Sequence, residues 1–226
     1  MFVADRDDLT RLLDAFLDSR DRHWDGFYAD RARPCPFFVD EPDENLVELC
    51  AALPPGRALD LGCGNGRNAT FLARRGWRVD AVDLSSTALA WARERAAGLD
   101  VRFQECSVFA ADVRPGAYDL VYDGGLFHHL PPHRRPDHVA LVDRALAPGG
   151  RLGLVCFRPG GGSGSTDLQV YERRTVGGGL GFDEAQLRAV WDRPPFALRD
   201  LRPMRSGGEH FGEDFLWALL AEKRGA

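Results

Sequence analysis

The chain has 226 residues, of which 44% are apolar and 28% are charged, a balance typical of a globular protein that buries a core. The formal net charge of -5 provides no overall positive field, which disfavours nucleic acids and anionic membranes as partners and favours small or neutral molecules. Five scattered cysteines without a C-x-x-C pair argue against a disulfide framework and a thiolate zinc site. No signal peptide or apolar membrane span is recognisable. We therefore expect a cytoplasmic protein.

Three helices are predicted in residues 1–55. Apolar residues within 9–17 recur at positions i, i+3, i+4, i+7 and i+8, which places one apolar stripe on a helix. The aromatic group at 24–28 and the apolar residues at 46–53 have helical spacing as well, and "PPG" ends the third helix. We expect this segment to form a helical cap.

The chain between 56 and 157 alternates short apolar runs with helical stretches. In chain order, this series of apolar runs and helical stretches is "RALDLG", "NATFLARR", "WRVDAVD", "STALAWARERA", "VRFQEC", "YDLVYD", "HVALVDRAL" and "RLGLVCF". Strands that alternate with helices are typical of βαβ units and of a parallel sheet buried on both faces. The pattern predicts a single α/β domain over 1–226, with its cofactor-binding core in 56–157.

The last third, residues 158–226, begins with a loop and ends with strands. The glycine- and serine-rich 158–167 predicts a flexible lid loop, while 168–180 shows no assignable pattern. "DEAQLRAVW" predicts a helix with Asp183 as its N-cap, and "FALRDL" and "FLWALLAEK" predict closing strands.

A glycine-rich loop, "ALDLGCGNGRN", joins a predicted strand to a predicted helix. Its glycines, Gly62, Gly64 and Gly66, let the backbone turn sharply and approach a ligand. A dinucleotide fingerprint requires a further glycine at 67, where Arg67 stands. Asp83, at the end of the next strand, is placed to accept both ribose hydroxyls of a nucleoside, whether that of NAD or of S-adenosylmethionine.

With an acidic residue ahead of G-x-G-x-G, the loop resembles the first motif of the class I S-adenosylmethionine-dependent methyltransferases. The resemblance spans about residues 57–157 and implies a doubly wound, Rossmann-like, seven-stranded and mostly parallel sheet, with S-adenosylmethionine as cofactor and S-adenosylhomocysteine as product. The cofactor carries an ammonium and a sulfonium, so an anionic group beside the loop is useful, and Asp60 fits that need. The implied cofactor-binding residues of the core are Asp60, Gly62, Cys63, Gly64, Asn65, Gly66, Asp83, Leu84, Ser107, Val108 and Asp123. Ser107 stands where the family commonly has an aspartate near adenine, although a hydroxyl or backbone N–H can also contact adenine.

Three of the six histidines lie in "YDGGLFHHLPPHRR", just after the predicted fourth strand. Two prolines separate His129 from His133 and break the helix that would align them, and no acidic or cysteine ligand accompanies them in sequence, so we expect no metal site. Ligands bind at the carboxyl ends of parallel strands, which puts His128 and His129 beside the cofactor. They either form a wall of the site or act as a general base, and methyl transfer often needs no base because the donor is already activated.

The same segment is similar to the thiopurine methyltransferase-like branch in its acidic, aromatic, proline and arginine-proline positions. That branch also has an aromatic N-terminal helix over the cofactor, which "HWDGFY" matches with Trp24 and Tyr28, whereas spacing alone favours core packing of these two rings. For Arg135, anchoring of an acidic substrate is the functional interpretation and a solvated surface charge is the alternative.

We therefore expect a methyltransferase that acts on an O, N or S atom of a small molecule. An NAD-dependent oxidoreductase is disfavoured by Arg67, and a nucleic-acid methyltransferase by the acidic balance and by "DGGLF" in place of an Asn/Asp-Pro-Pro-aromatic motif. A non-catalytic S-adenosylmethionine-binding protein stays open, as does the oligomeric state.

Overall fold

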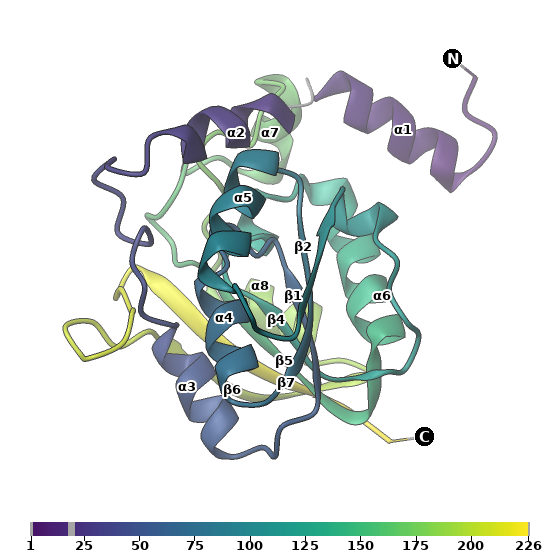
Figure 1. Cartoon of the computed structure of the whole chain (residues 1–226). Helices are drawn as coiled ribbons and strands as arrows, with labels where there is room; N and C mark the ends of the chain where they lie inside the picture. Colours follow the sequence, from purple (N-terminus) through teal and green to yellow (C-terminus); the bar gives the residue numbers. More distant parts are fainter. Residues whose placement is uncertain (1, 18–20, 226) are drawn as a thin grey trace.

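A single seven-stranded sheet forms the centre of the fold (Figure 1). The computed structural model describes residues 2–17 and 21–225. The strands lie in the order β3-β2-β1-β4-β5-β7-β6, and β7 runs antiparallel to both of its neighbours while the other pairs are parallel. Their bounds are β1 Arg57–Leu61, β2 Arg78–Asp83, β3 Val101–Glu105, β4 Tyr118–Asp123, β5 Leu146–Phe157, β6 Phe196–Pro203 and β7 Leu216–Lys223. The predicted seven-stranded, mostly parallel sheet is confirmed.

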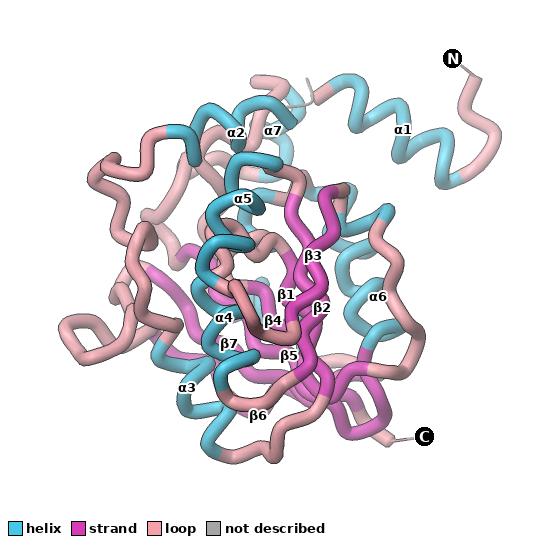
Figure 2. The backbone as a smooth tube through the Cα atoms, in the orientation of Figure 1, coloured by secondary structure: helices cyan, strands magenta, loops and turns pink. Residues whose placement is uncertain are grey.

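Helices cover both faces of this sheet, as a doubly wound fold requires (Figures 1 and 2). Apolar residues of α3, α4 and α5 join the buried cluster on one face, and those of α6 and α8 join the cluster on the other. The helices are α1 Arg6–Phe16, α2 Asp21–Ala29, α3 Glu44–Ala51, α4 Arg67–Arg74, α5 Ser86–Arg95, α6 Arg135–Ala145, α7 Asp167–Glu172 and α8 Glu184–Trp191, with short 3₁₀ turns η1 Val108–Ala110, η2 Phe127–His129 and η3 Pro132–Arg134. None of the described helices is long and apolar enough to cross a membrane.

Side-chain caps set the starts of the later helices. Asp183 accepts the backbone N–H of Gln186 at 2.8 Å, which confirms the predicted N-cap of α8. The segment 168–180, for which the sequence shows no assignable pattern, contains most of α7. This helix begins with a capping box between Thr166 and Gln169. The signal for α7 was therefore present in the sequence as a threonine three positions before a glutamine.

The strand order reverses direction at β1. From β1 the chain builds outward to β2 and β3 on one side, then returns to β4 and β5 on the other. Ligands of open α/β sheets bind at such a switch point, outside the carboxyl ends of the strands. Here those ends carry the glycine loop after β1 and the histidine segment after β4.

Candidate functional site

At its three glycine positions, the loop after β1 has no room for a side chain. Gly62, Gly64 and Gly66 all have positive φ angles, of 67°, 53° and 75°, which other residues adopt only with strain. A Cβ on Gly64 would lie 2.5 Å from the hydroxyl of Tyr28, and one on Gly66 would lie 2.6 Å from the Cβ of Ala92. Gly66 thus brings α4 close to α5, and Gly64 brings the loop close to α2.

A cavity of about 50 Å³ lies against this loop. The glycine loop, the start of α4, the residue after β4 and the aromatic rings preceding α3 all contribute to it. Its lining residues are Tyr28, Phe37, Asp60, Gly62, Cys63, Gly64, Asn65, Arg67, Asn68 and Gly124. The cavity therefore sits at the switch point that the sheet topology indicates.

Asp60 contributes to this cavity a buried carboxyl group with one unpartnered oxygen. The residue is 1% exposed, and its Oδ2 has no hydrogen-bond partner among the described residues. Burial raises the pKa of Asp60 to about 8, and the nearby carboxylate of Asp43 adds to the rise. An ammonium group in the cavity would satisfy Oδ2 and favour the ionised form, so the site fits the amino-acid end of S-adenosylmethionine.

Asp83, at the end of β2, faces the same loop. Its Oδ2 accepts the backbone N–H of Gly64 and its Oδ1 that of Ser85, both at 2.8 Å. The α5 N-cap is Ser85 itself, whose hydroxyl accepts the N–H of Ala88 at 3.0 Å. Burial raises the pKa of Asp83 against these hydrogen bonds. The carboxylate is thus fixed beside the glycine loop, where a ribose would be recognised.

Helix α2 lies over the start of α5 (Figure 1). Asp25 accepts hydrogen bonds from the hydroxyl of Ser85 at 2.7 Å and from the N–H of Thr87 at 3.1 Å. The ring of Tyr28 stacks on Phe38 with centroids 5.4 Å apart. These contacts hold the aromatic face of α2 against the cavity.

Asp123, at the end of β4, holds the segment that follows it. Its Oδ1 accepts the N–H groups of Gly125, Leu126 and Phe127 at 2.7 to 3.2 Å. Its Oδ2 lies 2.8 Å from Nε2 of His138 on α6, and both side chains are fully buried. Both oxygens are engaged within the chain, so the carboxylate positions the histidine segment.

The two adjacent histidines form an aromatic wall. His128 is 5% exposed, its ring centroid is 3.9 Å from that of Phe157, and its Nδ1 has no partner among the described residues. His129 meets the ring of Trp24 edge-on at 4.8 Å. Burial lowers the pKa of His128 well below its usual value and that of His129 to about 4. Both imidazoles are therefore neutral near pH 7.

The third histidine of the segment, His133, contacts α1 and α7 instead of joining this aromatic wall. Its Nε2 lies 2.8 Å from Asp14 on α1, and its Nδ1 lies 3.1 Å from the hydroxyl of Tyr171 on α7. In the part of the chain that the structure describes, no group of three or more His, Cys, Asp or Glu side chains is arranged to hold a metal ion.

The remaining predicted site residues lie at the edges of this region. Leu84 is 39% exposed beside Asp83, and Ser107 caps η1 while Val108 is buried in the core. Arg135 makes two 2.8 Å hydrogen bonds to Asp167 and so ties α6 to α7. Its guanidinium is already paired with a carboxylate of the chain.

Four residues that line the cavity were not among the predicted site residues: Phe37, Arg67, Asn68 and Gly124. From the sequence, Arg67 is interpreted only as the residue that replaces the third glycine of a dinucleotide fingerprint. The signal for a place at the cavity is its position directly after the glycine loop, because the start of such a helix lies beside the ligand.

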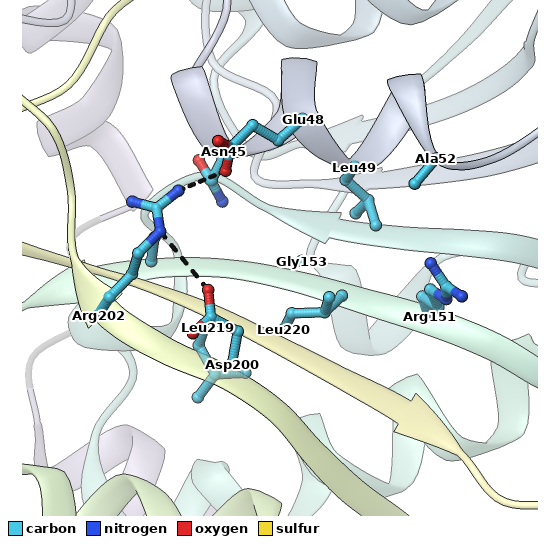
Figure 3. Close-up of a pocket in the computed structure, with 11 residues that line it drawn as sticks. Asn45, Glu48, Leu49, Ala52, Arg151, Gly153, Asp200, Arg202, Leu219 and Leu220 are labelled. Atoms are coloured by element: carbon cyan, nitrogen blue, oxygen red, sulfur yellow. Dashed lines mark hydrogen bonds and ion pairs between the residues drawn. The ribbon is translucent and has the colours of Figure 1, made fainter.

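A second hollow, of about 130 Å³, lies between α3 and the strands β5, β6 and β7 (Figure 3). There Arg202 pairs with Glu48 at 2.7 Å and approaches Asp200 at 3.5 Å. Among its lining residues no buried polar side-chain atom lacks a partner. This hollow is on the sheet face, away from the strand ends, whereas the cavity at the glycine loop has unpartnered groups.

Residues 58–150 match a family described as a methyltransferase domain. The chain is 31% identical to a 2-heptyl-1-hydroxyquinolin-4(1H)-one methyltransferase of Mycobacteroides abscessus, over 56% of this chain and 57% of the relative. It is 32% identical to a ubiquinone biosynthesis O-methyltransferase of Xanthomonas campestris pv. campestris, over 63% of this chain and 59% of the relative. The chain thus spans less than two thirds of the length of these curated relatives.

Solved structures share the fold more completely. One is a 1,6-didemethyltoxoflavin-N1-methyltransferase of Burkholderia thailandensis with bound 1,6-didemethyltoxoflavin and S-adenosylhomocysteine. It has a TM-score of 0.63 at 23% identity, and the alignment covers 99% of this chain and 92% of that chain. A protein from a study of thioacetal formation during echinomycin biosynthesis has a TM-score of 0.68 at 23% identity and covers 90% and 93%. Residues 58–150 therefore resemble a methyltransferase domain, and the solved structures confirm the predicted Rossmann-like fold.

Proposed function

We propose that this chain is a class I S-adenosylmethionine-dependent methyltransferase, which transfers a methyl group from that cofactor to an O, N or S atom of a small molecule. The observation that carries the proposal is the unpartnered, buried carboxylate oxygen of Asp60, which faces a cavity bounded by the glycine loop. A carboxylate left without a partner inside a protein is costly, so its presence favours a cationic ligand.

Different residues of the chain would bind different parts of the cofactor. Asp60 would bind the ammonium group, while Asp83, with Leu84 beside it, would accept the ribose hydroxyls. Ser107 and Val108, which follow β3, would border the adenine, and Trp24 and Tyr28 on α2 would cover the site. When bound, S-adenosylmethionine supplies a methyl group activated by a sulfonium.

His128 and His129 would form the wall of the acceptor site. Their neutral rings avoid repulsion with the cationic cofactor and can accept a hydrogen bond from an acceptor hydroxyl or amine. Orientation of the two reactants then provides most of the acceleration, up to about 7–11 kcal/mol in favourable cases. Asp123 and His138 act indirectly, by fixing the segment that carries the wall.

A flat, apolar acceptor suits this wall, which is built from Trp24, His128, His129 and Phe157. The named acceptors of the relatives include a hydroxyquinolone, which supports a ring compound as the class to test first. The loop 158–167 borders the wall through Gly179, because Ser163 donates its N–H to the carbonyl of Gly179 at 2.7 Å and a Cβ at Gly179 would lie 2.8 Å from His128. We propose that this loop is the lid of the acceptor site.

The charge and the thiols support a proposed location and a proposed class of acceptor. All five cysteines are free, which supports the reducing cytoplasm as the place of action. The net charge of -5 supports a small-molecule acceptor over a nucleic acid.

The test is incubation of the purified protein with S-adenosylmethionine and a panel of hydroxylated and aminated ring compounds, with mass-spectrometric detection of both products. Equal amounts of methylated acceptor and S-adenosylhomocysteine are expected. Tight cofactor binding without turnover on any acceptor would favour a non-catalytic binding protein, and binding of NAD in place of S-adenosylmethionine would favour an oxidoreductase.

A further inference from the structure

The segment 158–181, which we call the cover, crosses over itself on the aromatic wall. A Cβ on Gly162 would lie 2.3 Å from the carbonyl oxygen of Gly179. A Cβ on Gly179 would in turn lie 2.8 Å from the side chain of His128 and 2.9 Å from that of Phe157. The two glycine-rich parts of the cover therefore meet directly on the wall.

Helix α7 joins these two parts and buries little apolar surface. Of its six residues only Val170 is buried, and Leu168 is 67% exposed. Burial of one aliphatic side chain contributes no more than the ordering of about one or two backbone residues costs. Other contacts must therefore fix α7, and with it the cover.

His133 makes one of these contacts. The hydroxyl oxygen of Tyr171 on α7 accepts the backbone N–H of His133 at 3.1 Å and lies 3.1 Å from Nδ1 of its ring. On the other side of the ring, Nε2 lies 2.8 Å from Oδ1 of Asp14 on α1. Both ring nitrogens thus have partners within the chain, and the ring joins α1 to α7.

The direction of these hydrogen bonds follows from Asp14. Burial opposes its ionisation, but hydrogen bonds from Arg134 and His133 outweigh burial and lower the pKa of Asp14, so its carboxylate accepts. Nε2 of His133 therefore donates to it. In the neutral ring, Nδ1 is then the acceptor of the hydroxyl proton of Tyr171.

The two residues after His133 anchor the same helices. Arg134 pairs with Asp14 on α1, and Arg135 pairs with Asp167 on α7 through two hydrogen bonds of 2.8 Å. All three anchoring residues come after the two prolines that follow the wall, and proline fixes its own φ angle. The segment that carries the wall therefore also holds the cover.

We propose that His133 is a positioning residue of the acceptor site, which holds the cover closed on the aromatic wall through Tyr171. The inference rests on the proposed function, because the wall bounds an acceptor only if the chain is a methyltransferase. His133 acts through the cover and not on the reacting atoms. Its loss should open the cover and weaken acceptor binding, while the chemical step and cofactor binding stay unchanged.

The first test is hydrogen–deuterium exchange of the backbone amides of the full chain, measured by mass spectrometry. Tyr171→Phe removes the hydroxyl contact and should speed exchange in the cover about three- to tenfold, with exchange in the strands of the sheet unchanged. His133→Gln keeps a donor for Asp14 but loses the acceptor for Tyr171, so it should behave like Tyr171→Phe. His133→Asn keeps an acceptor near the place of Nδ1 and should retain slow exchange in the cover.

Tyr118→Phe is the matched control. It also removes one hydrogen bond of a tyrosine hydroxyl, the bond to Asp80 at 2.8 Å, but it does so at the start of β4, whereas the wall follows the end of that strand. Exchange in the cover should be the same in this variant as in the wild-type chain.

The second test is steady-state kinetics with a ring compound that the wild-type chain methylates. Tyr171→Phe and His133→Gln should raise KM for this compound about three- to tenfold. Both variants should leave kcat, and the Kd for S-adenosylhomocysteine, within about twofold of the wild-type values. A loss of folded protein would instead lower the apparent kcat with KM unchanged.

Unchanged exchange in the cover of Tyr171→Phe, or equal exchange in His133→Asn and His133→Gln, would overturn the inference, as would a lower kcat without a higher KM. Circular dichroism checks the fold of each variant, and if the His133 variants unfold, Tyr171→Phe decides the question. A wild-type chain that methylates no ring compound would count against the proposed function, whereas the exchange measurements still decide whether His133 holds the cover.

Discussion

The hydroxyl of Tyr28 rests against Gly64 so closely that a methyl group at position 64 would lie 2.5 Å from the oxygen. The contact joins two parts of the chain that the sequence separates by 36 positions: the aromatic helix α2 and the glycine loop. Burial raises the pKa of Tyr28 far above its usual value, so the hydroxyl stays neutral beside Asp83. The loop and its cover are thus shaped to each other.

Substitution of Gly64 tests this fit. Gly64→Ala should lower the free energy of unfolding and weaken cofactor binding, because the new Cβ meets the Tyr28 hydroxyl and the positive φ costs about 1–2 kcal/mol by itself. The double variant Gly64→Ala with Tyr28→Phe should recover the part of the lost stability that is due to the hydroxyl, because the next atom of the ring lies 3.3 Å from a Cβ at position 64. Chemical denaturation of the four proteins measures the coupling, and strictly additive effects would contradict the contact.

Asp60 should lower the stability of the unliganded chain at high pH and favour binding of the cofactor. Its pKa of about 8 in the folded chain lies above the usual value of 3.8, so the folded chain holds the proton more tightly and the free energy of unfolding falls as pH rises from 3.8 to about 8. Asp60→Asn removes this dependence and should stabilise the unliganded chain at pH 8 by on the order of a few kcal/mol.

The same variant should bind S-adenosylmethionine poorly, because the amide cannot pair with the ammonium. Wild-type affinity should rise between pH 6 and 8, about tenfold per unit at most, as Asp60 ionises. Parallel denaturation curves and titrations of the two proteins across this range provide the check. A variant that is less stable than wild type at pH 8 would contradict the buried, unpaired carboxylate.

The sequence predicted the sheet and much of the loop because both are local patterns. Apolar runs that alternate with helical stretches indicate the strands, and the glycines with Asp60 and Asp83 indicate the ligand end of the sheet. The contacts of Arg67 could not be predicted in this way, because its partners Asp43 and Phe211 lie 24 positions before it and 144 positions after it in the sequence. The pairing of Arg135 with Asp167 could not be predicted either, because a sequence does not distinguish a solvated arginine from one that is paired with a distant carboxylate.

Asp123 and His138 should be coupled energetically. Removal of either partner leaves a buried polar group unpaired, so Asp123→Ala and His138→Ala should each destabilise the chain by about 3–5 kcal/mol. The double variant should cost less than the sum, with a coupling of about 1–3 kcal/mol. Urea denaturation measures all three, and additive losses would mean that the pair does not fix the histidine segment.

His129 should remain neutral well below its usual pKa. Burial lowers the pKa of His129 from the usual 6.5 to about 4 in the folded chain, so the free energy of unfolding falls as pH falls from 6.5 towards 4. Nuclear magnetic resonance of ¹³C-labelled histidine follows the titration, and His129→Phe assigns the signal. Titration of this ring near 6.5 would place it in water and remove it from the aromatic wall.

The most direct test of the central claim is calorimetric titration with S-adenosylmethionine, S-adenosylhomocysteine and NAD, for the wild-type chain, Asp83→Ala and the surface control Asp112→Ala. We predict micromolar binding of both S-adenosyl ligands to the wild type and to Asp112→Ala, loss of that binding in Asp83→Ala, and none of NAD. Binding of NAD alone, or S-adenosylmethionine affinity that is unchanged in Asp83→Ala, would contradict a methyltransferase site at the glycine loop.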